Sequence, residues 1–508
     1  MNVYLLFILA CIPIIWLMVS LLKLKMPGHI TCPISLIITV VLAVSIWKMP
    51  VVDSLTASME GFALALWPIM LVIIAAVFTY NLSIHTKSMD VIKKMMTSIT
   101  TDKRILVLIL AWGFGGFLEA IAGFGTAVAI PASILAALGF EPIFAAVICL
   151  IANTTPTAFG AIGIPVTTLA KVTNLDVVHL SYAVGLQLSV LIVIVPIVLV
   201  MLTGKSIKAI KGVFLISLAS GLSFAIPELL AAKYLGAELP AILGSVVCMA
   251  VTILIAKVFY KEKAKTEVEN ISFKEGILAW LPFILVFLFI IFTSPLFPGI
   301  NAALSKVNTS VNIYSGAGAH AYTFTWLSTP GTLIIIATFI GGLIQGAKFK
   351  DILMVLLKTF KQMSKSVITI LSIVALAKVM GYSGMIKSIA VVIVAATGKY
   401  FPLIAPVIGA LGTFVTGSDT SANVLFGGLQ VEVAKSLGLN PYWLAAANTC
   451  GATAGKMISP QSIAVATAAT GLVGAEGKIL GSTIKFCIVY VIVLGAMVYF
   501  TASIFGFK

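Results

Sequence analysis

The sequence predicts an all-α protein that crosses a membrane many times. Hydrophobic residues make up 60% of the 508-residue chain and charged residues only 10%, whereas soluble domains average about 45–50% apolar and about 25% charged residues. Many apolar runs approach the roughly 20 residues that a helix needs to span a bilayer. At that length the chain accommodates about 12 to 14 transmembrane segments. We therefore expect the bilayer to surround most of the chain.

Several runs are long and apolar enough to predict a membrane span directly. They are residues 3–22, 30–47, 61–80, 181–203, 213–230, 239–257, 277–296, 329–346 and 482–504. The first run has no basic region before it and no clear small-residue cleavage site after it. It therefore predicts a retained first helix rather than a cleaved signal peptide.

The charge distribution predicts the orientation in the membrane. The net charge is +15, and the basic residues collect in the connections at 23–25, 87–104, 205–211, 257–265 and 348–365. Cytoplasmic loops carry such an excess of cations, so no nucleic-acid partner is needed to explain it. This orientation places the N-terminus outside, together with the segment around Asp53 and Glu60 and the polar stretch 297–327.

Two regions, 112–173 and 411–470, interrupt the plain hydrophobic spans. Both are rich in Gly, Thr, Ser, Asn and Pro, which predicts broken or re-entrant helices. An unsatisfied backbone group in hydrocarbon costs several kcal/mol, so broken helices persist only inside protein or beside a water-filled cavity. We expect both regions to line the interior.

The two regions also share a spaced pattern of residues. Identical pairs lie 295 positions apart at Asn153 and Asn448, Thr154 and Thr449, Gly160 and Gly455, and Pro165 and Pro460, and 294 apart at Gly123 and Gly417, and Thr126 and Thr420. This predicts two pseudo-symmetric repeats, and paired interrupted segments are typical of a transporter's binding site. Close packing of small residues is the alternative. Inverted and parallel repeats both remain open; we expect inverted ones, which suit alternating access.

The same observations predict how the chain is divided. The predicted parts are N-terminal helices and a cytoplasmic loop in 1–104, a first broken transport segment in 105–175, scaffold helices in 176–398, a second broken transport segment in 399–475, and a C-terminal helix in 476–508.

Charged residues at membrane depth are functional candidates, since burying one costs at least a few kcal/mol. Glu119 and Asp419 stand at nearly matching places in the two broken regions, and either can bind a coupling proton or cap a half-helix. Lys456 lies among small and polar residues in the second region and is the cation we expect to face a carboxylate substrate. Snorkelling of this lysine to the interface is the alternative.

Neutral polar groups complete the predicted substrate site. Half-helix N-termini at the glycine breaks add N–H groups and a positive dipole end. The expected substrate-binding residues are Gly123, Thr126, Asn153, Thr154, Ser418, Thr420, Asn448, Thr449, Lys456, Ser459 and Gln461. The alternative for the side chains is hydrogen bonding to the broken backbone itself.

Other classes of protein fit less well. The sequence has no HExxH, GxSxG or GxxxxGK[ST] motif, so we expect no enzyme, no catalytic residue, no cofactor and no metal. A channel is expected to have a continuous polar pore lining, whereas the polar residues here concentrate in two segments. The histidines, at 29, 85, 179 and 320, fall near predicted span ends or in loops, which favours interfacial roles over a proton relay.

Four stretches carry a resemblance to a known family. They are GFLEAIAGFGTAVAIPASILAALGF, LIANTTPTAFGAIGIP, TGSDTSANVLFGGLQ and AANTCGATAGKMISPQSIAVA, and together they resemble the L-lactate permease family of bacterial carboxylate transporters. The resemblance spans both repeats.

That resemblance implies secondary active import of L-lactate, and in some relatives of D-lactate or glycolate, in symport with protons across a bacterial cytoplasmic membrane. The implied partners are a small carboxylate, protons and the lipid bilayer. Sodium coupling, or a broader carboxylate and dicarboxylate specificity, is the alternative, because unwound carbonyls with Ser, Thr and Asp oxygens also make sodium sites. The sequence is compatible with a homodimer.

Overall fold

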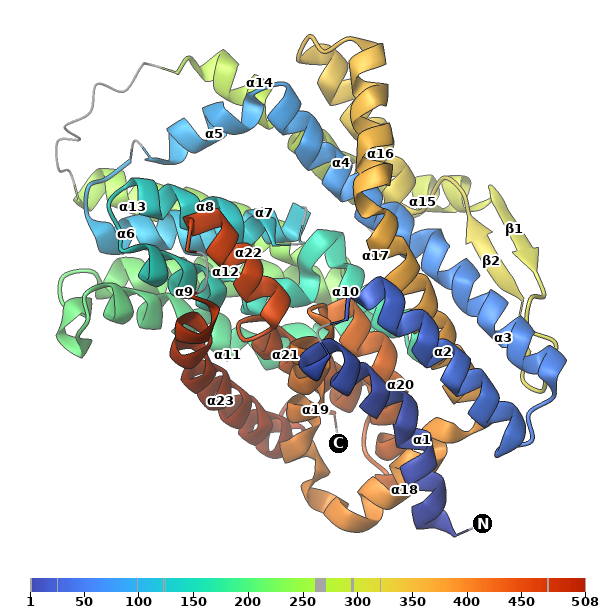
Figure 1. The fold of residues 1–508 in the computed structure, drawn as a ribbon. Helices are drawn as coiled ribbons and strands as arrows, with labels where there is room; N and C mark the ends of the chain where they lie inside the picture. The colour runs from blue at the N-terminus through green and yellow to red at the C-terminus, as the bar shows by residue number, and fades with distance from the viewer. Residues whose placement is uncertain are drawn as a thin grey trace.

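The computed structural model has the predicted helical membrane fold (Figure 1). It describes residues 2–24, 26–97, 99–121, 123, 125–260, 271–293, 297–319, 321–472 and 475–507. Parts of the predicted basic connections, residues 25 and 261–265, lie outside the described residues, as does His320.

The N-terminal part is a series of helices along one side of the molecule (Figure 1). These are α1 (Val3–Met18), α2 (Gly28–Ser45), α3 (Val51–Leu64), α4 (Leu71–His85) and the short α5 (Ser88–Thr97). A kink at Trp67, within Ala65–Met70, joins α3 to α4. Asp53 and Glu60, around which we predicted an external segment, both belong to α3, whose N-cap is Pro50.

The first broken region begins with a helical stretch of 19 residues, Lys103–Ile121, and continues as shorter helices. The stretch contains α6 (Lys103–Val107) and α7 (Gly115–Ile121), and the shorter helices are α8 (Thr126–Ala137), α9 (Pro142–Ala152) and α10 (Gly160–Thr173). The α7–α8 break contains Gly123 and Gly125, both with a positive φ, which glycine adopts without a steric penalty. A 51° bend separates α9 from the Thr155–Thr173 helical stretch.

The next part of the chain contains longer helices and two shorter ones. The longer ones are α11 (Val177–Thr203), α12 (Phe214–Tyr234), α13 (Pro240–Phe259), α14 (Phe273–Thr293) and α17 (Phe349–Ser383), and the shorter ones are α16 (Pro330–Ile344) and α18 (Met385–Thr397). Helix α17 has 35 residues, so the predicted basic connection at 348–365 is in fact its first half. This prediction was wrong because, in the sequence, lysines on a helix that continues beyond the bilayer cannot be distinguished from lysines in a basic loop.

The predicted external stretch 297–327 forms a small folded unit. It contains α15 (Pro298–Ser305) and an antiparallel hairpin of β1 (Asn308–Val311) and β2 (Tyr322–Thr325), with Asn308 paired with Thr325. The hairpin lies beside α3 at one edge of the molecule (Figure 1).

The second broken region also consists of helices that are separated by short breaks. They are α19 (Phe401–Thr416), α20 (Asp419–Leu437), α21 (Pro441–Lys456) and α22 (Pro460–Thr470). Helix α23 (Glu476–Thr501) then runs along the outside, against α19 and α21. Gly451 of α21 allows the close approach of α19, since a Cβ there would lie 1.9 Å from the carbonyl oxygen of Pro406.

The number of helices fit to span a membrane is ten within the described residues, or eleven if the bent α9–α10 pair counts as one span. Three shorter apolar helices, α1, α8 and α16, fall below that length. The predicted 12 to 14 segments are reached only if these also cross.

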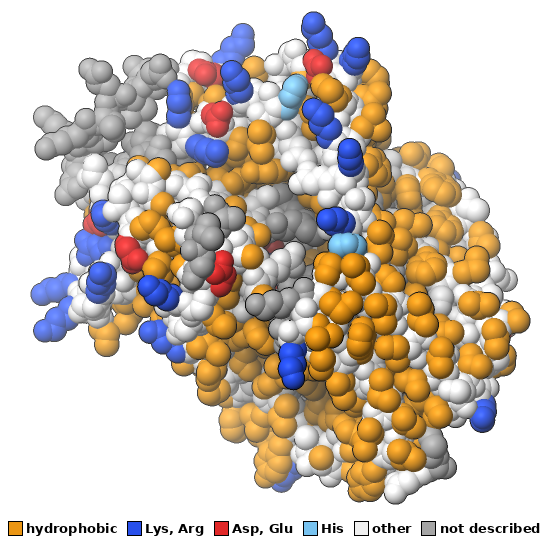
Figure 2. Space-filling model, viewed as in Figure 1, with side chains coloured by type: hydrophobic (Ala, Val, Ile, Leu, Met, Phe, Trp, Pro, Cys, Tyr) orange, Lys and Arg blue, Asp and Glu red, His pale blue; other side chains and the backbone are white. Residues whose placement is uncertain are grey.

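The exterior has the polarity expected of a membrane protein (Figure 2). Hydrophobic side chains cover the broad face over α1, α2 and α3, whereas Lys and Arg gather toward the opposite margins, near the α4–α5, α16–α17 and α11–α12 connections. Exposed apolar residues such as Ile37, Val41 and Leu55 belong to that face. A band of this kind is stable only against lipid.

A buried ion pair joins α3 to α17. Lys378 Nζ lies 2.7 Å from Glu60 Oε1, and Tyr382 donates a second hydrogen bond of 3.0 Å to the same oxygen. The ring of Tyr314, from the segment before β2, stacks on Tyr382 at 3.8 Å between centroids. The hairpin is therefore attached to α17 through this pair of rings.

Replacing Lys378 by Met should destabilise the protein by up to about 3–5 kcal/mol, because it leaves the Glu60 carboxylate buried without its cation. Thermal unfolding in detergent measures the change. The double variant Glu60→Gln/Lys378→Met is expected to recover most of the loss. An unchanged melting temperature in the single variant would show that the pair contributes nothing.

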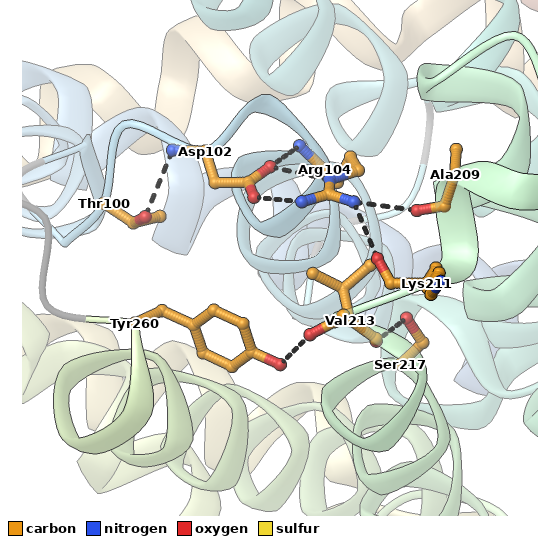
Figure 3. Close-up of polar contacts among 9 residues, drawn as sticks. Thr100, Asp102, Arg104, Ala209, Lys211, Val213, Ser217 and Tyr260 are labelled. Carbon is orange, nitrogen blue, oxygen red and sulfur yellow. Dashed lines mark hydrogen bonds and ion pairs between the residues drawn. The ribbon is translucent and has the colours of Figure 1, made fainter.

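A polar cluster fixes the connection between α11 and α12 at the basic end of the molecule (Figure 3). Arg104 donates to Asp102 Oδ2 at 2.7 Å and to the carbonyl oxygens of Ala209 at 2.8 Å and Lys211 at 3.3 Å. Tyr260 donates to the carbonyl of Gly212 at 2.6 Å. Burial alone would raise the pKa of Asp102, but hydrogen bonds from Arg104 outweigh it and hold that pKa below its ordinary value.

Candidate functional site

A cavity of about 410 Å³ lies where the two broken regions meet. Its walls come from the α7–α8 break, the start of α10, the α19–α20 and α21–α22 breaks, and one face of α17. This size lies within the range of about 300–1,000 Å³ that small-molecule sites occupy.

Helices α8, α20 and α22 are three of those that begin at this cavity. Gly125 is the N-cap of α8, Ser418 is the N-cap of α20, and Ser459 accepts a 3.2 Å hydrogen bond from the backbone N–H of Ser462 at the start of α22. Each helix start carries a partial positive charge and N–H groups without a partner inside the helix. Their convergence creates an environment that favours an anion.

Three charged side chains from different helices meet beside the helix starts. Lys456 Nζ, at the end of α21, lies 4.0 Å from Glu119 Oε1 of α7. Asp419, the first residue of α20, accepts a 3.1 Å hydrogen bond from Thr413 and lies within electrostatic reach of both Lys456 and Glu119. All three residues are buried.

This group of charges is only partly satisfied. Within the part of the chain that the structure describes, Glu119 Oε2 and Asp419 Oδ2 have no hydrogen-bond partner. Buried carboxylate oxygens without a partner are costly. The group therefore has capacity to bind protons or a polar ligand.

Glycine makes room for this arrangement at two positions. A Cβ on Gly160 would lie 2.7 Å from Glu119 Oε1, so a larger residue would displace the carboxylate. Gly417, with φ of +73°, lies against Gln461, whose side-chain oxygen would be 2.1 Å from a Cβ. Both glycines belong to the repeated pattern found in the sequence.

The backbone after Gly160 is strained. Ala161, Ile162 and Gly163 all have positive φ, with 44° for Ala161 and 59° for the β-branched Ile162. Such conformations cost about 1–3 kcal/mol each for residues other than glycine and concentrate at functional sites. Ala161 lines the cavity.

The structure brings seven of the predicted site residues to the cavity wall. They are Gly123, Ser418, Thr420, Lys456 and Gln461, with the two proton-coupling candidates Glu119 and Asp419.

The other six predicted residues do not line the cavity. Thr126 and Thr154 hydrogen-bond to backbone carbonyls within their own turns, and Ser459 binds Ser462. Asn448 and Thr449 join a buried amide network through Asn423, at 3.0 Å and 2.8 Å. Asn153 is buried, and neither of its side-chain polar atoms has a partner among the described residues.

Some cavity residues were missed by the sequence analysis. Thr157 belongs to the first broken region but was not selected, and Lys365, Ser366 and His29 come from α17 and the start of α2. Lys365 is exposed whereas Lys456 is buried. The periodicity of α17 is that of an ordinary amphipathic helix, so no local signal distinguishes its cavity face.

A second missed group lies away from the cavity. Glu228, in α12, is fully buried, and both carboxylate oxygens lack a partner in the described chain. The run 213–230 was predicted as a plain span. In the sequence, a single carboxylate near the end of an apolar run looks like a residue at the membrane boundary. Its burial becomes visible only from the packing of α12 between α11 and α13.

A many-spanning helical protein with a charged cavity at the breaks of its interior helices is a membrane transporter. The profile of the L-lactate permease family matches residues 6–505. The chain belongs to the L-lactate permease family, as the resemblance predicted. Because the family consists of permeases, the prediction that the chain is not an enzyme is also confirmed.

Several curated relatives match over nearly their whole length. The chain is 60% identical to an L-lactate permease of Streptococcus iniae, over 86% of this chain and 93% of the relative. It is 37% identical to a glycolate permease of Escherichia coli and 35% identical to an L-lactate permease of the same organism, each over 98% of this chain and 96% of the relative. The solved YdaH transporter of Alcanivorax borkumensis matches at 12% identity with a TM-score of 0.47, over 85% of each chain.

Proposed function

We propose that the protein imports L-lactate, and also glycolate, in symport with protons across a bacterial cytoplasmic membrane. The observation that carries the proposal is the position of Lys456, a buried cation at a cavity where helices α8, α20 and α22 begin. Relatives named for L-lactate and glycolate support the substrate class. A 2-hydroxy acid is small enough to fit and has a carboxylate for Lys456 and a hydroxyl for Ser or Thr oxygens.

The charges around Lys456 support coupling to protons. With Glu119 and Asp419 both ionised, the three side chains carry one net negative charge, which repels a carboxylate. One bound proton makes the group neutral, and a second makes it positive. Because attraction between charges is stronger in a buried site than in water, protonation and anion binding favour each other.

We propose that transport alternates access through the breaks in the two broken segments, 105–175 and 399–475, which belong to inverted repeats. The cavity reaches His29 and Lys365, close to connections whose basic residues predict the cytoplasmic side. In this mechanism, the cavity in the present conformation opens toward the cytoplasm. Opening to the outside requires a rearrangement at the α7–α8 and α19–α20 breaks.

Uptake of labelled L-lactate into proteoliposomes tests the function. An inward proton gradient should drive accumulation without sodium, and glycolate should compete better than a dicarboxylate. Pyruvate, which lacks the hydroxyl, should compete less well than glycolate. Accumulation that depends on sodium, or competition led by a dicarboxylate, would replace this proposal by the sodium-coupled or broader-specificity alternative.

The variant Asp419→Asn tests the coupling. Asparagine has nearly the same shape but holds no exchangeable charge, so we expect proton-driven accumulation to fall at least tenfold while lactate exchange between loaded vesicles continues. Glu119→Gln is the matched variant on the other side of Lys456. Unchanged accumulation in both variants would remove the two carboxylates from the coupling role.

A further inference from the structure

A second cavity, of about 490 Å³, opens at the basic end of the molecule between α9, α11 and α23. It shares no lining residue with the first cavity. We propose that it binds an anionic phospholipid of the cytoplasmic leaflet, with the phosphodiester at its rim and an acyl chain along its wall.

The wall is apolar and comes from three helices. Phe144 and Val147 belong to α9, Met201 and Leu202 to the end of α11, and Phe486 to α23. Burying hydrocarbon contributes about 0.8 kcal/mol per CH₂ group. An acyl chain is therefore a better occupant for this wall than water or a free polar metabolite.

The rim is polar and carries a small positive charge. Lys205 and Ser206 follow α11, and Ser482 and Lys485 lie one turn apart on α23. Glu141, the N-cap of α9, is the acidic residue of the lining, so two lysines and one carboxylate leave a net charge of +1. One phosphodiester neutralises that charge, and the hydroxyl of Ser206 can donate to its oxygens.

Lys205 begins the α11–α12 turn, whose later residues bind Arg104 in the cluster of Figure 3. Its φ is 53°, a left-handed conformation that is unusual for a residue with a side chain. Arg104 binds the carbonyls of Ala209 and Lys211 a few residues further on, which fixes the turn between α11 and α12. The turn therefore presents Lys205 to the rim as part of a rigid structure.

The depth of the second lysine favours a lipid over a soluble anion. Lys485 lies within the apolar span Glu476–Thr501 and is exposed on its surface. A lysine at such a position extends toward the interface, where lipid phosphates lie. Ile207, also in the lining, is 74% exposed and would contact acyl chains. Basic pockets between transmembrane helices on the cytoplasmic side commonly hold anionic lipid head groups.

The bound lipid would contact both a helix of the first broken region and long helices outside that region. Helix α9 leads into the broken region around the first cavity, whereas α11 and α23 are long helices outside it. A lipid between them would restrain α9 relative to its neighbours. Lipid composition would then affect the transport rate as well as binding.

Native mass spectrometry of the purified full chain with phosphatidylglycerol or phosphatidylcholine tests the site. The double variant Lys205→Gln/Lys485→Gln should lose at least fivefold in phosphatidylglycerol binding. The matched control, Lys208→Gln/Lys211→Gln, removes two charges from the same turn outside the lining and should keep it. Glycerol phosphate and inorganic phosphate should not displace the lipid.

Three results would overturn the proposal. They are equal loss in both double variants, no loss in the rim variant, and displacement by inorganic phosphate, which would indicate a free-anion site. Thermal unfolding of each variant shows whether it is folded. If the double variant is unfolded, the single variant Lys485→Gln is used for the same test. Because lipid binding is measured without lactate, the result is independent of the proposed transport function.

Discussion

Replacing Lys456 by Gln is expected to reduce lactate uptake at least a hundredfold. Glutamine keeps the length of a polar side chain but removes the buried cation between Glu119 and Asp419. A carboxylate substrate would then meet two acidic groups with no counter-charge. Losing a charged hydrogen-bond partner in a buried site costs several kcal/mol, which is enough for this effect. Initial rates of labelled uptake and of exchange should fall together.

The control for this prediction is Lys365→Gln. Lys365 lines the same cavity from α17 but is exposed to solvent. Its charge is screened, so uptake should fall only a few-fold. Comparable losses in the two variants would mean that Lys456 has no special role, and near-normal uptake by Lys456→Gln would place the anion elsewhere.

Replacing Gly451 by Val is expected to prevent accumulation of folded protein. At this position α19 and α21 touch backbone to backbone, and a Cβ would lie 1.9 Å from the Pro406 carbonyl oxygen. The contact cannot be relieved by a side-chain rotation. Overpacking typically costs about 1–3 kcal/mol and more where backbone must move. Size-exclusion profiles and thermal unfolding of a fluorescent fusion measure the loss.

Gly481→Ala provides the comparison. Gly481 also lies within a helix, α23, but nothing is within 4 Å of the position of its Cβ. Alanine there should be neutral or stabilising by about 0.5–1 kcal/mol, because glycine is a poor helix former. If Gly451→Val were as well folded as Gly481→Ala, the close packing of α19 and α21 would not be essential.

The membrane fold and the position of the site were predictable from the sequence for specific reasons. Long apolar runs have few stable alternatives, and a Gly- and Pro-rich interruption is tolerated only in the interior. Repeated glycines such as Gly160 and Gly417 therefore marked the regions that meet at the cavity. Glu119, Asp419 and Lys456 could be selected because charges are rare at that depth.

The sequence did not predict which neutral polar residues face the cavity. Asn448 and Thr449 were selected with Lys456, yet they bind Asn423 within the protein. Asparagine and threonine side chains can hydrogen-bond either to a ligand or to a broken backbone. Which of the two they do depends on the rotation of the helix about its axis, which the sequence pattern does not reveal. Contributions from distant segments, such as Thr157 and the α17 face, depend on tertiary packing alone.

Helix α17 links the cavity mechanically to the hairpin. It faces the cavity around Lys365, and its Tyr382 stacks on Tyr314 in the loop of the hairpin. Lys365 and Tyr382 are separated by about 25 Å along the axis at 1.5 Å per residue. A continuous helix is stiff over that distance, so tilting it at one end must displace the other. We therefore expect an environment-sensitive dye on the exposed Ser310 of the hairpin to report movements of α17 at the cavity.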